Sequence, residues 1–376
     1  MIKAIINAKI IVDNSIVEDK VLFFDNKIVK ITDNVPLDNV EIIDAKGNYV
    51  SAGFIDMHIH GSGGADVMDA TPNALETLST AVLKTGTTSF LATTMTMSSK
   101  EIDKALQNIQ NYAKDVSGAK ILGVHLEGPF LNVSKHGAQD KRYIQKPNFE
   151  LIENYIDEVK MITIAPEVEG AKDFMLLLKN RYPHIILSIG HSNASYEKSM
   201  ESFSLGVTHA THLFNAMNSY HHREPGIVGA VFDSDVSCDV IADLVHTHAS
   251  ALELCYKMKK DKLFLITDSM RAGCMKSGSY ELGGQSVEVE DGKAILEDGT
   301  LAGSVLKLNK ALKNMITYTS MSRVEAINAV TKAPAQKLGL KKGELRVGYD
   351  ADIVIFDENF SIISTIVCGK IKYKRS

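Results

Sequence analysis

The stretch Ser51-Ala52-Gly53-Phe54-Ile55-Asp56-Met57-His58-Ile59-His60-Gly61 alternates apolar and polar residues as a β-strand does. Side chains at positions i and i+2 of a strand project on the same side, so His58 and His60 should point together. Two neighbouring imidazoles at the end of a strand are good ligands for a divalent metal. An isolated pair can equally be a core histidine followed by a loop residue, so further ligands must come from elsewhere in the chain.

The composition of the chain is that of an ordinary globular protein. Its 376 residues suffice for one large barrel and an accessory domain. The net charge of −5 gives no pull toward nucleic acid or an anionic membrane, and no apolar run approaches the ~20 residues of a bilayer span. We expect no signal peptide, and the four cysteines show no paired spacing. These features predict a cytoplasmic protein with reduced thiols and neither nucleic acid nor membrane as a partner.

Strand-like and helix-like segments alternate from residue 52 onward. Thr71-Pro72 marks the start of one helix, and Ser98-Ser99-Lys100-Glu101 is a capping box that opens another. The segments expected as strands are 51–61, 87–95, 121–127, 161–165, 185–191, 206–212, 236–243 and 263–268. Eight strands with intervening helices over ~220 residues predict an α/β fold of the (β/α)8 or TIM-barrel type.

The two ends of the chain read as short strands without helices. We expect residues 1–51 and 341–376 to be the two halves of one small β-sandwich domain, and residues 52–340 to form the barrel. Asp291-Gly292 and Asp298-Gly299 are hairpin-type turns, which predict a β insertion near residues 277–302.

Active sites of such barrels lie at the C-terminal ends of the strands. Five of the expected strands carry ligand-type residues there, namely His58 and His60, Glu127, His191, His212 and Asp268. His209 lies three residues before His212 and should face the opposite side, and His125 should lie one layer deeper than Glu127. The set predicts a metal centre at the mouth of the barrel.

Several motifs carry a family resemblance. Residues 53–60 resemble the first-strand motif of the amidohydrolase superfamily, and residues 343–357 its closing β-domain strands. Within that superfamily, residues 125–130, 190–192, 211–217, 223–226, 265–268 and 299–304 resemble the N-acetylglucosamine-6-phosphate deacetylase family, in family order. Two positions depart from the pattern, since Ala52 stands where proline is usual and Gln139 where some members have histidine.

The resemblance implies hydrolysis of the acetamide of N-acetyl-D-glucosamine 6-phosphate to D-glucosamine 6-phosphate and acetate, in amino-sugar catabolism and cell-wall sugar recycling. It implies Glu127, His191 and His212 as principal metal ligands, Asp268 as the catalytic acid/base, and His58 and His60 as ligands of a second ion. The substrate-contacting positions that it implies are Ala138, Gln139, Asn215, Ala216, Arg223, His246, Leu301, Ala302, Gly303 and Ser304. It also implies a homodimer whose site is shared between the subunits.

Three of these side chains suit particular parts of an amide hydrolysis. Arg223 offers a fork of donors that fits a phosphate group, and His246 could add a second donor. A neutral donor such as Gln139 could stabilise the oxyanion that develops at the carbonyl. Tyr220, His221 and His222 crowd the same loop as Arg223 and receive no role.

Imidazole and carboxylate ligands suit zinc, iron, manganese or cobalt, with either one ion or two. A close alternative is deacetylation of N-acetylgalactosamine 6-phosphate. A cyclic-amide hydrolase on the same barrel typically uses a carboxylated lysine on the fourth strand, and residues 162–167 contain no lysine. An inactive assembly module of this fold would typically have lost metal ligands that this chain keeps.

Overall fold

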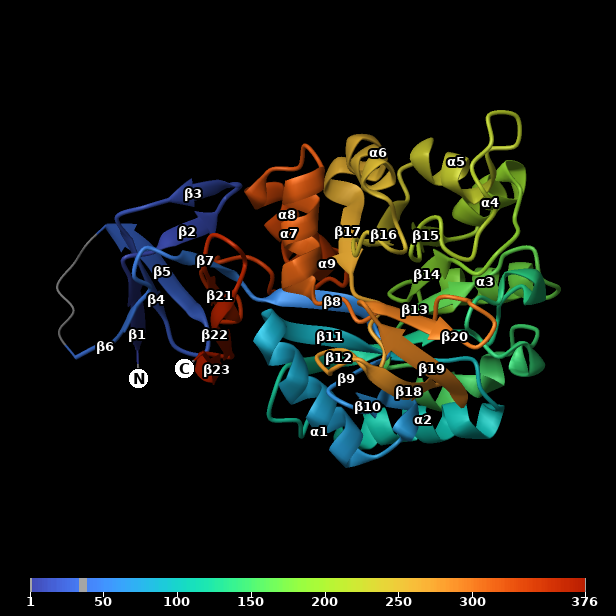
Figure 1. Cartoon of the computed structure of the whole chain (residues 1–376), viewed down its shortest axis with the longest axis horizontal. Helices are drawn as coiled ribbons and strands as arrows, with labels where there is room; N and C mark the ends of the chain where they lie inside the picture. Colours follow the sequence, from blue (N-terminus) through green and yellow to red (C-terminus); the bar gives the residue numbers. More distant parts are fainter. Residues whose placement is uncertain (1, 34–38, 376) are drawn as a thin grey trace.

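The computed structural model describes residues 2–33 and 39–375. Its largest sheet has eight parallel strands that neighbour one another in chain order, which confirms the expected barrel (Figure 1). The bounds of these strands are β8 (Phe54–Ile59), β11 (Thr87–Thr94), β12 (Lys120–Glu127), β13 (Val159–Ile164), β14 (Ile186–Ile189), β15 (Val207–Ala210), β16 (Ser237–Ile241) and β17 (Leu263–Ile266). The Asp268 N–H donates to the His58 carbonyl and the His60 N–H to the Ser269 carbonyl, so the ring is nearly closed.

Helices surround this barrel and begin where the capping residues predict. Thr71 accepts a hydrogen bond from the Ala74 N–H at the start of α1, and Ser98 and Glu101 form a capping box at the start of α2. The helix bounds are α1 (Pro72–Ala81), α2 (Ser99–Tyr112), α3 (Ala171–Arg181), α4 (Tyr196–Ser204), α5 (Gly226–Phe232), α6 (Ala249–Lys259), α7 (Leu308–Tyr318), α8 (Arg323–Val330) and α9 (Lys332–Lys337). Because helices cover its outer face, strands such as β8, β11 and β14 are buried along their whole length.

The stretch 51–61, expected as one strand, is divided at Gly53. Residues Tyr49–Ala52 form β7 of an outer sheet, and only Phe54–Ile59 enter the barrel as β8. The Gly53 N–H donates to the Asp352 carbonyl at 2.8 Å. A β-carbon at Gly53 would lie 2.2 Å from Thr88 Oγ1, so only glycine allows the chain to pass between the two sheets.

Both ends of the chain contribute to one β domain, seen beside the barrel in Figure 1. Its six-stranded sheet has the order β23-β22-β21-β7-β2-β3, and β21 runs antiparallel to β7 where the two ends meet. Its four-stranded sheet has the order β5-β4-β1-β6. The bounds are β1 (Lys3–Ile6), β2 (Lys9–Val12), β3 (Ser15–Val17), β4 (Lys20–Phe24), β5 (Ile28–Asp33), β6 (Glu41–Asp44), β7 (Tyr49–Ala52), β21 (Ile353–Phe356), β22 (Ile362–Val367) and β23 (Lys370–Lys374).

A separate apolar cluster that includes Ile5, Phe24, Val50 and Ile353 fills the β domain. We therefore propose that residues 1–51 and 341–376 form this domain and that residues 52–340 form the barrel.

A small antiparallel sheet is inserted in the chain after β17, the last strand of the barrel. It consists of β18 (Gly278–Leu282), β19 (Gln285–Glu290) and β20 (Lys293–Leu296), and Asp291 and Gly292 turn between the last two strands with positive φ. The Gln285 side chain donates to the Ala138 carbonyl at 2.7 Å, which fastens this sheet beside the mouth. Short strands β9 (Gly61–Ser62) and β10 (Ala65–Asp66) follow the His-x-His segment. Within the two described ranges, no helix has the length and apolar character needed to cross a membrane.

Candidate metal centre

The predicted ligands all lie at the C-terminal ends of barrel strands. Glu127 is the last residue of β12, whereas His191, His212 and Asp268 each lie two residues beyond the end of a strand. These three residues have φ values of 46°, 34° and 49°, in the left-handed region that non-glycine residues rarely adopt. At each of these three residues, the left-handed turn lets the backbone leave the sheet while the side chain points into the mouth of the barrel. Such conformations cluster at functional sites.

One group of ligand atoms surrounds the first oxygen of Glu127. Its Oε1 lies 2.9 Å from His212 Nε2 and 3.2 Å from His191 Nε2, and the two nitrogens are 3.2 Å apart. All three side chains are buried. The atoms lie close enough to one another to hold one metal ion.

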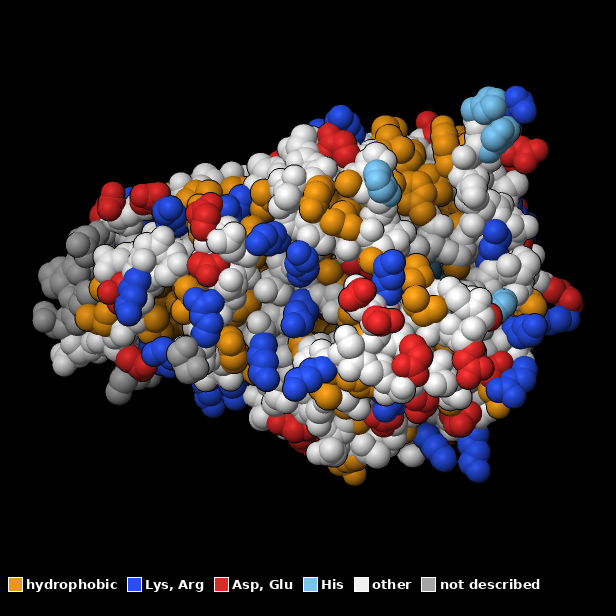
Figure 2. Space-filling model, in the orientation of Figure 1, with side chains coloured by type: hydrophobic (Ala, Val, Ile, Leu, Met, Phe, Trp, Pro, Cys, Tyr) orange, Lys and Arg blue, Asp and Glu red, His pale blue; other side chains and the backbone are white. Residues whose placement is uncertain are grey.

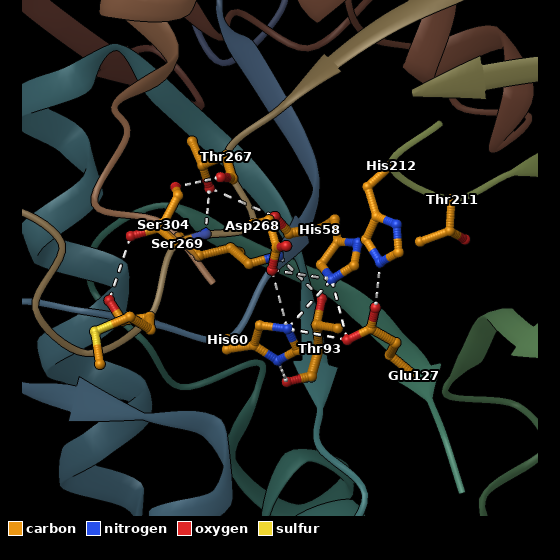
Figure 3. A network of polar contacts seen from close by, with 12 residues as sticks. His58, His60, Thr93, Glu127, Thr211, His212, Thr267, Asp268, Ser269 and Ser304 are labelled. Carbon is orange, nitrogen blue, oxygen red and sulfur yellow. Dashed lines mark hydrogen bonds and ion pairs between the residues drawn. The ribbon is translucent and has the colours of Figure 1, made fainter. Parts of the chain in front are cut away.

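A second group surrounds the other oxygen of Glu127. Its Oε2 lies 3.1 Å from His60 Nε2 and 3.4 Å from His58 Nε2, and these nitrogens are 3.2 Å apart (Figure 3). The Oδ1 of Asp268 lies 3.4 Å from His58 Nε2 and 3.2 Å from His60 Nε2. Glu127 therefore stands between two groups of histidines, and Asp268 faces the second.

The pKa values show that this site favours positive charge. Although burial raises the pKa of Glu127 and Asp268, the neighbouring histidines lower both pKa values below their ordinary range. Burial lowers the pKa of His212, but Glu127 outweighs it and raises that pKa to about 9. His60 behaves in the same way beside Asp268 and Glu127, and its pKa is raised well above the usual value. The carboxylates thus attract cations, either protons on the imidazoles or a metal ion.

The hydrogen bonds of two histidines fit a metal ion better than protons. Nδ1 of His60 lies 3.2 Å from the Thr93 carbonyl, and Nδ1 of His191 lies 2.9 Å from the Lys135 carbonyl. A carbonyl only accepts, so each Nδ1 carries the hydrogen and leaves Nε2 with a free lone pair in the neutral ring. Nitrogens with free lone pairs that face one another across 3.2 Å suit a shared cation. The donor set therefore fits a divalent metal.

Gln139 holds Glu127 in this arrangement. Its Nε2 donates to Glu127 Oε2 at 2.8 Å and lies 3.6 Å from Met95 Sδ, while its Oε1 accepts the Thr96 N–H at 2.6 Å. We expected this amide as a donor to the substrate carbonyl. In the structure one N–H of this amide donates to Glu127, a charged acceptor within reach, and its donation to a substrate carbonyl stays a prediction.

His125 on β12 and His209 on β15, the two histidines that precede ligand candidates, are both buried. The His125 ring is buried against His58, with centroids 4.6 Å apart, and its Nε2 lies 2.7 Å from Thr163 Oγ1. His209 contacts Ser237 and Asp239 of the neighbouring strand β16. Neither ring joins the ligand groups.

The profile described as "Amidohydrolase family" matches residues 49–372 of the sequence. The chain belongs to the amidohydrolase family. This amidohydrolase is 40% identical over 356 residues to the N-acetylglucosamine-6-phosphate deacetylase of Lysinibacillus sphaericus, an alignment that covers 93% of this chain and 92% of the relative.

Solved structures of N-acetylglucosamine-6-phosphate deacetylases also resemble the chain over at least 99% of its length. The amidohydrolase superposes with a TM-score of 0.95 on N-acetylglucosamine-6-phosphate deacetylase from Pasteurella multocida, at 32% identity and full coverage of both chains. A mutant of the N-acetyl-D-glucosamine-6-phosphate deacetylase from Mycobacterium smegmatis, in complex with N-acetyl-D-glucosamine-6-phosphate, superposes with a TM-score of 0.93. That match has 25% identity and covers 99% of this chain and 100% of the other.

A cavity of about 230 Å³ opens onto both ligand groups of the amidohydrolase. Most of the predicted substrate positions line it, namely Ala138, Gln139, Asn215, Ala216, His246, Leu301 and Gly303. Leu282 of the inserted sheet and Thr300, which follows β20, line it as well, and neither is among the predicted substrate positions, although Thr300 lies within the motif 299–304. The insertion therefore forms one wall of the cavity.

Three predicted substrate positions lie elsewhere. Ala302 is fully buried in the small apolar core under the inserted sheet, where its N–H donates to the Ala294 carbonyl of β20 at 3.0 Å. Ser304 is also buried and donates its N–H to the Asp268 carbonyl and its hydroxyl to the Thr267 carbonyl, so it supports the backbone at Asp268 rather than lining the cavity. Arg223 is exposed on the loop before α5, where it contacts His222 at 2.8 Å.

The motifs missed the residues that hold the ligands. Asp239 accepts the backbone N–H of His212, and Asp56 accepts that of His58 at 3.3 Å. Each is a carboxylate on a fully buried barrel strand, β8 for Asp56 and β16 for Asp239, and a charged residue in a largely apolar segment is a sequence signal for a buried partner. The carbonyls of Thr93 and Lys135 leave no such signal, because any residue supplies a carbonyl.

Proposed function

We propose that this amidohydrolase removes the acetyl group from N-acetyl-D-glucosamine 6-phosphate, giving D-glucosamine 6-phosphate and acetate. The observation that carries the proposal is the convergence of Glu127 with four histidines and Asp268 beside a cavity of suitable size. A relative at 40% identity has this activity in its name, and a structural neighbour is complexed with this sugar.

In this proposal Glu127, His191 and His212 would hold one divalent ion, and where a second ion binds, His58 and His60 would hold it with the second Glu127 oxygen. Zinc, iron, manganese and cobalt all suit imidazole and carboxylate ligands. Such an ion supplies Lewis acidity, which polarises the acetamide carbonyl and lowers the pKa of a water molecule. Glu127 belongs to both groups of ligand atoms, so metal binding would depend on it most.

Asp268 is the proposed acid/base. Its pKa below the ordinary range keeps the carboxylate ionised near neutral pH, ready to accept a proton from the attacking water. It then gives this proton to the sugar nitrogen as the C–N bond breaks, and the products are the amine and acetate. Ser304 and Thr267 fix the backbone around Asp268, which keeps Oδ1 facing the cavity.

The phosphate site is proposed to be completed by a second subunit. Arg223 is exposed and lies outside the cavity of its own chain, so it suits the phosphate of a partner's substrate. Figure 2 shows hydrophobic side chains gathered over α5 and α6, beside a projection with histidine and basic side chains. Tyr220, Leu254 and Met258 are exposed by 55%, 42% and 48%. An apolar face beside a projecting arginine supports a homodimer, with His246 as the donor from within the chain.

The cytoplasmic location predicted from the sequence remains part of this proposal. It is supported by the four cysteines, all of which are free.

The test is acetate release from N-acetylglucosamine 6-phosphate, with and without a metal chelator, and from N-acetylgalactosamine 6-phosphate in parallel. We expect metal-dependent release with preference for the glucosamine derivative. Faster release from the galactosamine derivative would reassign the substrate. A protein that binds metal but releases no acetate from either sugar would contradict the function.

A further inference from the structure

Strand β15 ends at Ala210, two residues before His212. β15 pairs with β16 through His209 and Ser237 and through Ala210 and Cys238, and the ladder stops there. His212 then takes a φ of 34°, which its β-carbon disfavours. A contact outside the ladder is needed to hold this turn.

Asp239 provides that contact. Its Oδ1 accepts the backbone N–H of His212, and its own backbone carbonyl accepts the N–H of Leu213 at 2.9 Å. The Asp239 carboxylate thus accepts the His212 N–H at the point where the backbone pairing between β15 and β16 has ended. Both groups are buried, so the His212 N–H has no water to replace this acceptor.

His209 in turn holds Asp239. Nε2 of His209 lies 2.9 Å from Asp239 Oδ2, and Nδ1 lies 2.7 Å from Ser237 Oγ. Burial lowers the pKa of His209 below its usual value, so its ring is neutral. A carboxylate oxygen only accepts, so Nε2 carries a hydrogen and donates to Asp239, while Nδ1 contacts the Ser237 hydroxyl, which also lies 3.1 Å from the Thr208 carbonyl. The three side chains form one chain of hydrogen bonds that ends at the His212 backbone.

His212 depends on this support more than His60 and His191 do. Those two rings are oriented by an Nδ1 contact with a backbone carbonyl. Nδ1 of His212 is buried and has no hydrogen-bond partner in the described part of the chain. The direction of its ring therefore follows from the position of its backbone, which Asp239 fixes.

We infer that Asp239, held by His209, is a positioning residue that sets how tightly the metal centre binds its ion. The inference rests on the proposed function, because it assumes that His212 ligates a metal. Neither Asp239 nor His209 lines the cavity, so both act through His212 and not on the substrate.

The experiment compares Asp239→Ala and Asp239→Asn with the unchanged chain. Zinc affinity is measured by chelator competition, and the visible spectrum of the Co²⁺-loaded protein reports the geometry of the ligands. Asp239→Ala should weaken zinc binding about 10- to 100-fold, as is typical when a group that orients a metal ligand is lost. Asp239→Asn keeps an acceptor oxygen for the His212 N–H and should recover most of the affinity.

Asp352→Asn is the matched control, since it alters a buried aspartate at the opposite end of the barrel. It should lower the melting temperature without changing zinc affinity or the cobalt spectrum. If Asp239→Ala does not fold, His209→Leu takes its place. This variant removes the donor to Asp239 but keeps the Asp239 carboxylate and the His212 N–H that it accepts. It should also weaken zinc binding and change the cobalt spectrum.

Unchanged zinc affinity and an unchanged cobalt spectrum in folded Asp239→Ala or His209→Leu would overturn the inference, even if the melting temperature fell. Failure of the unchanged chain to bind zinc or cobalt would instead contradict the proposed metal centre, and the inference would fall with it. The two failures are therefore distinguishable in one series.

Discussion

Two buried clusters of charge lie at opposite ends of the barrel, and they are neutralised differently. At the N-terminal end of the strands, the Lys342 ammonium lies 2.5 Å from Asp352 Oδ2, 3.4 Å from Asp350 Oδ2 and 3.0 Å from Ser89 Oγ. At the C-terminal end, Glu127 and Asp268 face imidazoles whose nitrogens crowd one another.

The difference teaches what separates a structural cluster from a functional one. At the closed end the chain supplies its own cation, so the carboxylates are paired without help from solvent. Among the described residues that line the cavity at the mouth there are carboxylates and imidazole lone pairs but no lysine or arginine. A cluster of this second kind is complete only with an ion from outside, which is the property that a catalytic metal site needs.

The largest expected effect comes from Glu127→Gln. This change keeps the shape of the side chain but removes the negative charge that both histidine groups share. We expect loss of bound metal and a fall in kcat of at least ~10³-fold, the scale seen when a central catalytic group is lost. Metal analysis and acetate release measure the two effects. Full metal content in this variant would show that the mouth needs no shared carboxylate.

Asp268→Asn should separate metal binding from proton transfer. The amide cannot accept the proton of water, so kcat should fall about 10²- to 10⁴-fold, while the metal held by Glu127, His191 and His212 remains. The measurements are steady-state kinetics and metal content of the same preparation. Retained turnover would remove Asp268 from the acid/base role.

Lys342→Met tests the cluster of Lys342, Asp350 and Asp352 at the N-terminal end of the barrel strands. It leaves Asp352 buried without its cation, which should reduce the free energy of unfolding by about 3–5 kcal/mol without changing the metal content. The double variant Lys342→Met, Asp352→Asn removes both charges and should recover part of this loss. Denaturant unfolding measures stability. A loss of metal in folded Lys342→Met would mean that the two clusters are not independent.

The smallest effect is expected from a change at Lys337, which is a partly buried cation with no ion-pair partner in the described part of the chain. Burial lowers its pKa to about 8, and its Nζ donates to the Thr208 carbonyl at 2.7 Å. An unfolded lysine titrates near ~10.4, so between these pKa values the unfolded chain binds more protons and stability rises with pH.

Lys337→Met should therefore stabilise the chain below pH 8, by up to about 3 kcal/mol, and this gain should vanish above pH 10 to 11. Unfolding measured at pH 7 and pH 10.5 checks the sign. An equal gain at both pH values would show that the charge of Lys337 is not the cause.

The sequence predicts the barrel, and the residues that it proposes as ligands lie together in the structure, because both follow from local patterns. Alternation brings His58 and His60 together, and strand ends identify Glu127. The sequence could not show that His191, His212 and Asp268 leave their strands through left-handed turns, since strand periodicity says nothing beyond the last paired residue. Nor could it show the division at Gly53, which depends on contact with Thr88.

Partners that are distant in sequence were also beyond prediction. Gln139 reaches Glu127 and Thr96 across a folded loop, and Asp239 reaches His212 from the neighbouring strand. Each contact depends on the angle at which a loop leaves the barrel, and no local pattern fixes that angle.

The most direct test of the account is anomalous diffraction from crystals of active protein, recorded at the absorption edge of the metal found by elemental analysis. The account predicts an anomalous peak within bonding distance of Glu127 Oε1 and of the Nε2 atoms of His191 and His212. No peak there, in crystals whose protein still releases acetate, would contradict it.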